Sequence, residues 1–159
     1  MNRDYTKAQL TMLVLLRLSI GWHFLYEGVV KISNPDWSAL GFLMDSKGIF
    51  EGMFKAMAAS PSIVNIVNIL NVWGLILIGA SLLVGLFSRP ALIAGIALLA
   101  LYYISHPPLI GAQYLLPSEG SYLVVNKNLI ELLAMGVLLV FPTSKLIGLD
   151  RMIFFKKTN

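Results

Sequence analysis

The segment LLRLSIGWHFLYEGVVKI, residues 15–32, decides the fold, because it completes an apolar run that begins near residue 10. A helix needs about 20 apolar residues to cross the hydrocarbon layer of a bilayer. The run is long enough, and Asn34-Pro35 ends it, since proline disfavours helical geometry in the residue before it. Its length, its charges and the lack of a small-residue cleavage site argue against a signal peptide. We therefore expect a transmembrane helix at about residues 10–32.

The overall composition also predicts a membrane protein. Of the 159 residues, 57% are hydrophobic and 13% are charged, and the mean hydropathy is +0.78. A soluble domain carries about 25% charged residues, so a soluble fold of this size would leave much apolar surface in water. The length suits a single domain over residues 1–159. Because the sequence has no cysteine, disulfides, thiolate metal sites and a catalytic thiol are excluded.

Three further apolar segments follow, at about residues 63–87, 91–106 and 127–143. Pro61 suits the first turn of the second span, Ser88-Arg89-Pro90 predicts a tight turn, and His106-Pro107-Pro108 stops the third span. We expect an all-α protein that forms a membrane four-helix bundle. The third and fourth spans are short, so each should extend at one end; the alternative is that one of them is only partly inserted.

The connection between the first two spans contains an amphipathic segment at about residues 47–58. Its apolar face carries Ile49, Phe50, Met53, Phe54 and Met57. Its charged face carries Lys47, Glu51 and Lys55. This pattern predicts a short helix that lies on the membrane surface or caps the bundle.

The placement of the basic residues predicts the orientation of the bundle. One side would carry seven of them, namely Arg3, Lys7, Arg89, Lys145, Arg151, Lys156 and Lys157. The other side would carry four, namely Lys31, Lys47, Lys55 and Lys127. Cytoplasmic loops carry an excess of Lys and Arg. We therefore expect a multi-pass protein of the inner (cytoplasmic) membrane, with both termini in the cytoplasm.

Four polar residues of the first span cannot face lipid, namely Arg17, His23, Glu27 and Lys31. A charge at the centre of a transmembrane helix costs about 2.5–3.5 kcal/mol on insertion scales. At about 100° per residue the four form one polar stripe, which must face the bundle interior. Gly21 and Gly28 lie beside the stripe and would let a neighbouring helix or a flat ligand come close.

Two interpretations of this stripe remain open. In the first, Arg17, Glu27 and Glu131 form a salt-bridge cluster that holds the helices in register. In the second, His23, Glu27 and Glu131 handle protons or bind a ligand, because a His–Glu pair at four-residue spacing can pass protons. A metal site is not expected, since two ligands do not make one.

Glu131 lies one turn into the fourth span and needs a cationic partner. Depth in the membrane favours Lys31, His23 or His106 over Arg17. On the second span Asn65, Asn68 and Asn71 recur every three residues. Such a row holds helices together through hydrogen bonds, and the alternative is that it lines a polar pocket.

Aromatic residues gather at the outer ends of spans three and four, namely Tyr102, Tyr103, His106 and Tyr122, with Trp37 and Trp73 expected close to them. An interfacial aromatic belt is the common role of such residues. The alternative is a pocket for a planar ring, in which His and Tyr hydrogen-bond carbonyl groups. Its mouth would lie at the outer helix ends, beneath the amphipathic helix.

Four pieces of the sequence, taken together and in order, resemble the DoxX/DoxD-like family of small integral membrane proteins. They are LLRLSIGWHFLYEGVVKI (15–32), WGLILIGASLLVGLFSRPALIAG (73–95), YYISHPPL (102–109) and EGSYLVVNKNLIELLAMGVL (119–138). The last two resemble the DoxD-like branch in particular. The resemblance covers nearly the whole chain and implies a four-helix bundle in the inner membrane.

The resemblance also implies a redox role. The DoxD-like branch is similar to the membrane subunit of thiosulfate:quinone oxidoreductase, which works with a second subunit and passes electrons to quinone. We expect a membrane subunit that binds a quinone or a similar lipid-soluble acceptor. The residues that would handle protons are Glu27, His23 and Glu131. The residues that would bind the ligand are Arg17, Lys31, His106, Tyr102 and Asn128. Whether the chain is itself catalytic stays open, because such chemistry needs a partner oxidoreductase.

Two other functions fit the same pattern. The bundle would be a non-enzymatic scaffold or anchor if its intramembrane charges are purely structural. A small carrier or pore fits less well, because four spans are few unless the protein forms a homo-oligomer. The expected partners are the lipid bilayer, a soluble or membrane redox protein, and other copies of the chain. Nucleic acid is not an expected partner.

Overall fold

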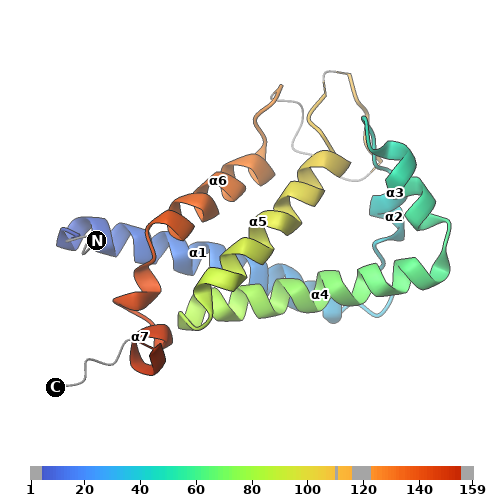
Figure 1. Ribbon diagram of the computed structural model, residues 1–159. Helices are drawn as coiled ribbons and strands as arrows, with labels where there is room; N and C mark the ends of the chain where they lie inside the picture. The colour runs from blue at the N-terminus through green and yellow to red at the C-terminus, as the bar shows by residue number, and fades with distance from the viewer. Residues whose placement is uncertain (1–4, 110, 116–122, 155–159) are drawn as a thin grey trace.

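The computed structural model describes residues 5–109, 111–115 and 123–154, and this part of the chain is all-α. Figure 1 shows the arrangement of the helices. In chain order they are α1 (Lys7–Ile32), α2 (Leu40–Met44), α3 (Glu51–Ala58), α4 (Pro61–Val84), α5 (Ser88–Ser105), α6 (Lys127–Val140), the 3-10 helix η1 (Thr143–Lys145) and α7 (Leu149–Phe154).

Three of the described helices, α1, α4 and α5, are long and apolar enough to cross a membrane, by length and composition. They correspond to the first three predicted spans. The fourth predicted span is helical only over the 14 residues of α6, which rise about 21 Å. Because the hydrocarbon core is about 30 Å thick, α6 alone is shorter than a perpendicular crossing requires.

The predicted amphipathic segment is helical over a shorter stretch than its pattern indicates. Gly48 has a left-handed φ of +88°, which interrupts a helix, and α3 begins only at Glu51. Phe54 of α3 packs in a cluster with Leu43 of α2 and Val64 of α4. One face of α3 is therefore buried against the start of α4.

The α1 and α4 helices lie side by side and antiparallel (Figure 1). Glycines make this approach close. A Cβ on Gly79 of α4 would overlap the backbone nitrogen of Leu25 and lie 2.7 Å from the carbonyl oxygen of Gly21. A Cβ on Gly28 would lie 2.9 Å from the backbone nitrogen of Ile76. Small residues let membrane helices pack backbone to backbone, so these glycines fix the register of α1 on α4.

The α5 and α6 helices cover the same side of the α1–α4 pair and pack on each other. Met135 of α6 is fully buried, and its side chain fills the space that a Cβ on Gly95 of α5 would take. Leu138 of α6 and Leu82 of α4 are also fully buried in this core. The core therefore joins all four of the longer helices.

The helix assembly has two ends with different structures. We call the first the turn end; it contains the α4–α5 connection (residues 85–87), the end of α6, η1 and α7. We call the second the loop end; it contains α2, α3 and residues 106–109 and 111–115. The polar residues of α1 run from the turn end toward the loop end.

The glycine contact between α1 and α4 yields a direct test. We expect Gly79→Ala to destabilise the protein by about 1–3 kcal/mol, because the added methyl group overpacks against backbone atoms that cannot move aside. The midpoint of thermal unfolding in detergent would measure the effect. Gly74→Ala is the matched control, since a Cβ there meets no atom within 4 Å and alanine favours the helix. Equal midpoints for the two variants would contradict the close α1–α4 contact.

Candidate functional site

The polar stripe of α1 meets different partners at three levels. Each residue of an α-helix rises about 1.5 Å, so about 9 Å separates Arg17 from His23 and about 21 Å separates Arg17 from Lys31 along the axis. Arg17 lies toward the turn end, His23 in the middle and Lys31 near the loop end. The stripe is therefore too long to be one compact site, and each level has its own chemistry.

At the turn end, Arg17 connects α1 to residues 143–154, which contain η1 and α7 and which we call the C-terminal segment. The residue is only 3% exposed. Its Nη1 donates hydrogen bonds to Thr143 Oγ1 at 3.1 Å and to the carbonyl oxygen of Ile147 at 2.8 Å. Both acceptors are neutral oxygens. These bonds hold η1 and the residues after it against α1.

Asp150 of α7 fixes the turn between α4 and α5. Its carboxylate accepts hydrogen bonds from the backbone N–H of Phe87 at 2.8 Å and of Ser88 at 3.3 Å. Its own N–H donates to the carbonyl oxygen of Gly85. Phe87 has a φ of +51°, a strained value for a residue with a side chain. A carboxylate at the first turn of a helix satisfies N–H groups that lack helical partners, and it also interacts favourably with the helix dipole.

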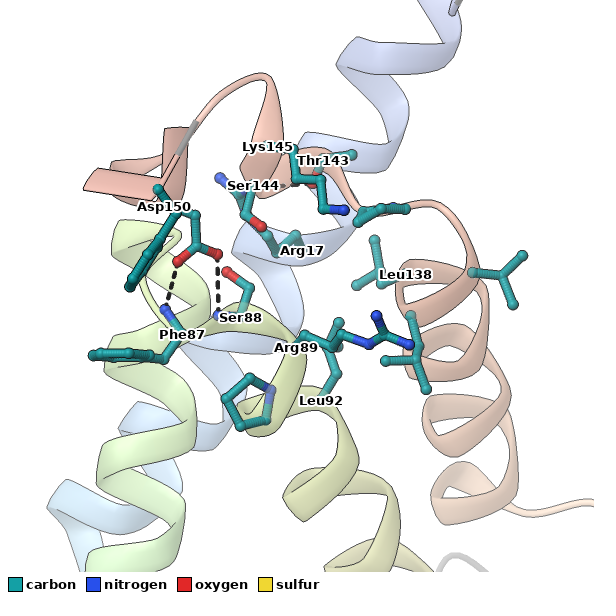
Figure 2. A pocket seen from close by; sticks show the side chains of 15 residues that line it. Arg17, Phe87, Ser88, Arg89, Leu92, Leu138, Thr143, Ser144, Lys145 and Asp150 are labelled. Carbon is teal, nitrogen blue, oxygen red and sulfur yellow. Dashed lines mark hydrogen bonds between the residues drawn. The ribbon is translucent and has the colours of Figure 1, made fainter. Parts of the chain in front are cut away.

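A cavity of about 810 Å³ lies at the turn end among α5, α6, η1 and α7. Its polar lining comprises Arg17, Ser88, Arg89, Ser144, Thr143, Lys145 and Asp150. Its apolar lining includes Leu92 of α5 and Leu138 of α6. Arg89 extends from α5 toward α6 in Figure 2. We expected a ligand pocket at the loop end, whereas this one depends on the C-terminal segment folding back over the helix ends.

In the middle of α1, His23 pairs with Glu131 of α6. His23 Nδ1 lies 2.7 Å from Glu131 Oε1. His23 is one of the three partners that depth favours for Glu131. The salt-bridge cluster of Arg17, Glu27 and Glu131, one of the two interpretations of the stripe, is not seen among the described residues. Ten residues, about 15 Å, separate Arg17 from Glu27 along α1, and the Glu131 carboxylate is taken by the histidine.

The His23–Glu131 pair is only partly enclosed. The His23 side chain is 33% exposed and that of Glu131 is 11% exposed. The second carboxylate oxygen, Glu131 Oε2, is buried and has no hydrogen-bond partner among the described residues. Since an ionised carboxylate only accepts hydrogen bonds, the Nδ1–H of His23 is the donor when Glu131 is ionised.

Near the loop end, Lys31 joins α1 to α4 and α5. Its Nζ donates a hydrogen bond to Asn71 Oδ1 at 3.1 Å, and the Asn71 amide donates to the hydroxyl of Tyr102. The ammonium group also lies over the rings of Trp37 and Tyr102, at 5.1 and 5.7 Å from their centres. Cation–π contacts of this kind stabilise a partly desolvated ammonium. Glu27, half-buried, is within electrostatic range of Lys31.

The asparagine row of α4 makes contacts to neighbouring segments. Asn71 links three helices as described, and it is buried. Asn68 accepts a hydrogen bond from the Ala39 N–H at 2.8 Å and lies 3.4 Å from Ser38 Oγ. Asn65 is exposed. At two of the three positions, therefore, the side-chain amide joins α4 to neighbouring segments of the chain.

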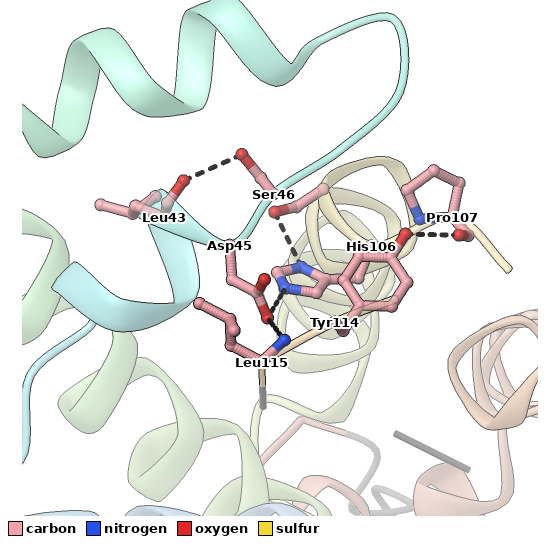
Figure 3. A network of polar contacts seen from close by, with 8 residues as sticks. Leu43, Asp45, Ser46, His106, Pro107, Tyr114 and Leu115 are labelled. Carbon is pink, nitrogen blue, oxygen red and sulfur yellow. Dashed lines mark hydrogen bonds and ion pairs between the residues drawn. The ribbon is translucent and has the colours of Figure 1, made fainter. Parts of the chain in front are cut away.

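His106, at the end of α5, lies in a separate polar network at the loop end (Figure 3). Its Nε2 is 3.9 Å from Asp45 Oδ2, and its Nδ1 is 3.1 Å from Ser105 Oγ. The ring stacks on Phe42 at 4.0 Å between centres and packs at 4.9 Å against Tyr114. Burial lowers the pKa of His106 below its ordinary value, and the neighbouring Asp45 only partly offsets this.

Asp45 organises the same network from the other side. It is buried, and its carboxylate accepts a hydrogen bond from the N–H of Leu115 at 2.8 Å. The hydroxyl of Tyr114 donates to the Pro107 carbonyl oxygen at 2.6 Å. Burial, and then the charge of Asp45, raises the pKa of Tyr114. A second cavity, of about 510 Å³, lies beside Asp45 and Tyr114.

The eight predicted site residues thus fall into separate places. His23 contacts Glu131, and Lys31 is linked to Tyr102 through Asn71, whereas Arg17 and His106 each belong to another network. Asn128 is half-buried in the first turn of α6. Groups of three or more His, Cys, Asp or Glu placed to hold a metal ion are not found among residues 5–109, 111–115 and 123–154.

The polar residues of these networks that the sequence does not single out include Asp45, Thr143 and Asp150. Asp150 is part of LDRMIF, a short segment at the end of the chain with a carboxylate in its first turn. That is a weak signal for a role at the distant α4–α5 turn. Asp45 likewise gives no indication, in sequence, that it faces His106, which lies 61 positions later.

Long apolar helices whose polar residues pair with one another inside the assembly define a multi-pass helical membrane protein. Within this class the chain belongs to the DoxX family, which matches residues 12–107. The match contains Arg17, His23, Glu27, Lys31, Tyr102 and His106. Asn128 and Glu131 lie outside it. The searches of curated proteins and of solved structures gave no match.

The lowered pKa of His106 predicts how stability depends on pH. Below its ordinary pKa of about 6.5, an unfolded His106 takes up a proton more readily than the folded one. The contribution of neutral His106 to the free energy of unfolding is therefore complete above pH 6.5, and it is lost as the pH falls toward the lowered pKa of the folded protein. We expect the midpoint of thermal unfolding to fall between pH 7.5 and 5.5, and His106→Gln, which has no titrating ring, to reduce that fall. An equal fall in both proteins would assign the titration to another group.

Proposed function

We propose that this protein is a small integral membrane subunit of a redox system, that it binds a quinone or a similar lipid-soluble electron acceptor, and that it works with a partner oxidoreductase. The observation that carries the proposal is the His23–Glu131 pair at 2.7 Å, in the middle of α1. Ionisable residues inside a membrane are costly and commonly mark a proton or ligand path. The DoxX membership and the resemblance to the DoxD-like branch favour the redox class.

The pair has the chemistry that quinone reduction requires. A quinone becomes a quinol by taking up two electrons and two protons. The partner oxidoreductase would supply the electrons, because the chain has no cysteine and no metal is expected. His23 and Glu131 would donate and recover protons, and Glu131 Oε2, which has no hydrogen-bond partner among the described residues, would be available for a further hydrogen bond. General acid–base groups need to be within about 2.6–3.2 Å of the proton they transfer, or to act through one water.

The approach to His23 suits a flat ring. Trp22 and Tyr26, on either side of it along α1, stack at 6.4 Å between ring centres and are 61% and 56% exposed. Their exposed faces would lie in the bilayer. A quinone head group that enters from the lipid would meet an aromatic surface beside a histidine that can hydrogen-bond its carbonyl.

The proposal includes the finer arrangement in the membrane. The α6 helix would be the fourth span of the bundle, tilted or completed by the residues that flank it, since α5 and α6 pack along each other. The turn end, with Lys7, Arg89, Lys145 and Arg151, would face the cytoplasm of the inner membrane. The exposed apolar residues at the start of α3, Ile49, Phe50 and Met53, would rest on the outer surface of that membrane.

A scaffold or anchor is the second candidate function, and a specific observation favours it. The hydrogen bonds described above for Arg17, Lys31 and Asn71 all go to other helices or to the C-terminal segment. A bundle that only anchors a soluble partner, or assembles as a homo-oligomer, needs no more than this. The partly exposed His23–Glu131 pair is the feature that a pure scaffold leaves without a role.

Quinone binding distinguishes the two candidates. We expect a short-chain ubiquinone to raise the unfolding midpoint of the purified protein in nanodiscs, and His23→Phe to weaken its apparent affinity at least tenfold, about 1.4 kcal/mol, because the ring is kept while the hydrogen-bonding nitrogens are lost. Glu51→Gln is the control, since it alters a carboxylate on α3, away from the pair. No retained quinone and no change in the midpoint would favour the scaffold.

A further variant separates binding from proton transfer. Gln at position 131 can accept the same hydrogen bond from His23, so Glu131→Gln should fold and should bind the quinone within about threefold of wild type. It cannot release a proton, so quinol formation in membranes that contain the partner should fall by about 10²-fold or more. Unchanged quinol formation would exclude Glu131 from the proton path.

A further inference from the structure

The turn-end cavity combines positive charge with an apolar wall. Three cations line it, Arg17, Arg89 and Lys145, against the single carboxylate of Asp150. That carboxylate already accepts two backbone hydrogen bonds from Phe87 and Ser88 (Figure 2). Among the described residues the lining is therefore net positive, and its one carboxylate is already hydrogen-bonded at the start of α5.

Two buried donors at this cavity lack partners. Arg17 Nε and Ser88 Oγ have no hydrogen-bond partner among the described residues, and each residue is 3% exposed. A buried polar group that makes no hydrogen bond is costly, and a buried charge more so. Arg17 has two bonds to neutral oxygens, and the Asp150 carboxylate is its acidic neighbour. That carboxylate is shared with two backbone N–H groups and with the other cations of the cavity, so an anion in the cavity would add the missing negative charge.

The position of Arg89 supports the same conclusion. It lies in the first turn of α5, where the positive end of the helix dipole disfavours a cation. Its side chain extends across the cavity toward α6 (Figure 2). Local helix electrostatics therefore does not explain a cation at this position, whereas a negatively charged ligand between α5 and α6 would.

The remaining wall of the cavity is apolar. Pro90 and Leu92 of α5 face Leu138, Leu139 and Val140 of α6 across it. A small soluble anion would bind the cations but make no contact with this apolar wall. A molecule with a charged head and a hydrocarbon tail would use both parts. Basic pockets between membrane helices are suited to the head groups of anionic lipids.

We propose that the turn-end cavity is a binding site for an anionic phospholipid, with its phosphate at Arg17, Arg89 and Lys145 and an acyl chain along the α5–α6 wall. The site is distinct from the His23–Glu131 pair and does not depend on the proposed redox function. The bound lipid would join α5, α6 and the C-terminal segment, which contact one another around the cavity. It would thereby stabilise the position of η1 and α7.

The test uses the delipidated full chain in detergent. Phosphatidylglycerol, phosphatidylcholine with the same acyl chains, and glycerol 1-phosphate are added separately, and binding is measured by native mass spectrometry and by the unfolding midpoint. The site variant is Arg89→Gln combined with Lys145→Gln. The control is Lys55→Gln combined with Lys127→Gln, which removes the same charge at the loop end. Both pairs keep Arg17, so the hydrogen bonds that hold the C-terminal segment remain.

We expect phosphatidylglycerol to bind at least tenfold more tightly than phosphatidylcholine, and the site variant, but not the control, to lose that preference. Glycerol 1-phosphate should bind at least tenfold more weakly than phosphatidylglycerol, because it lacks the acyl chain. Equal binding of the two lipids would overturn the proposal, as would full preference in the site variant. Binding of glycerol 1-phosphate as tight as that of the lipid would overturn it in favour of a soluble phosphate ligand.

Discussion

The need of each buried polar group for a partner within the protein is the constraint on which the rest of this structure depends. The hydrocarbon core of a bilayer offers neither hydrogen bonds nor counter-charges, so Arg17, His23 and Lys31 of α1 need partners from other elements of the protein. Each level of α1 recruits a different one. Arg17 holds the segment after α6, His23 holds α6 itself, and Lys31 reaches α4 and, through Asn71, α5. The stripe thus specifies which elements surround α1.

Close packing of α1 on α4 makes these partnerships reachable. Because Gly21, Gly28 and Gly79 let the two backbones touch, Lys31 comes opposite Asn71, and Arg17 comes opposite the turn at Gly85. A wider helix separation would leave the ammonium short of the amide. The glycines and the charges are therefore parts of one arrangement, in which small residues set the distance and polar residues set the register.

The sequence predicts the parts of this arrangement that depend on local pattern. Apolar length predicts α1, α4 and α5, and the 100° periodicity predicts that the charges of α1 face inward. The partners of these charges are harder to predict from the sequence, because they depend on the register between helices and on segments that lie far away along the chain. Thr143 and Ile147, which bind Arg17, lie 126 and 130 positions later, in a segment with no evident signal. The helical length of α6 was overestimated because apolar Phe141 continues the pattern past the last helical residue, Val140.

Structural and functional roles of the buried polar groups can be told apart by whether each group has all its hydrogen-bond partners within the protein. Lys31 and Asn71 are engaged with one another and with Tyr102, and such a set is explained by helix packing. Four buried atoms of the described residues have no hydrogen-bond partner, namely Arg17 Nε, Ser88 Oγ, His106 Nε2 and Glu131 Oε2. Two of them lie at the turn-end cavity, one faces Asp45 at 3.9 Å and one belongs to the His23 pair. Packing alone would favour removing such atoms or pairing them, since each costs free energy. Three of the four atoms lie at the turn-end cavity or in the partly exposed His23–Glu131 pair, and this distinguishes these two places from the purely structural contacts of the same stripe.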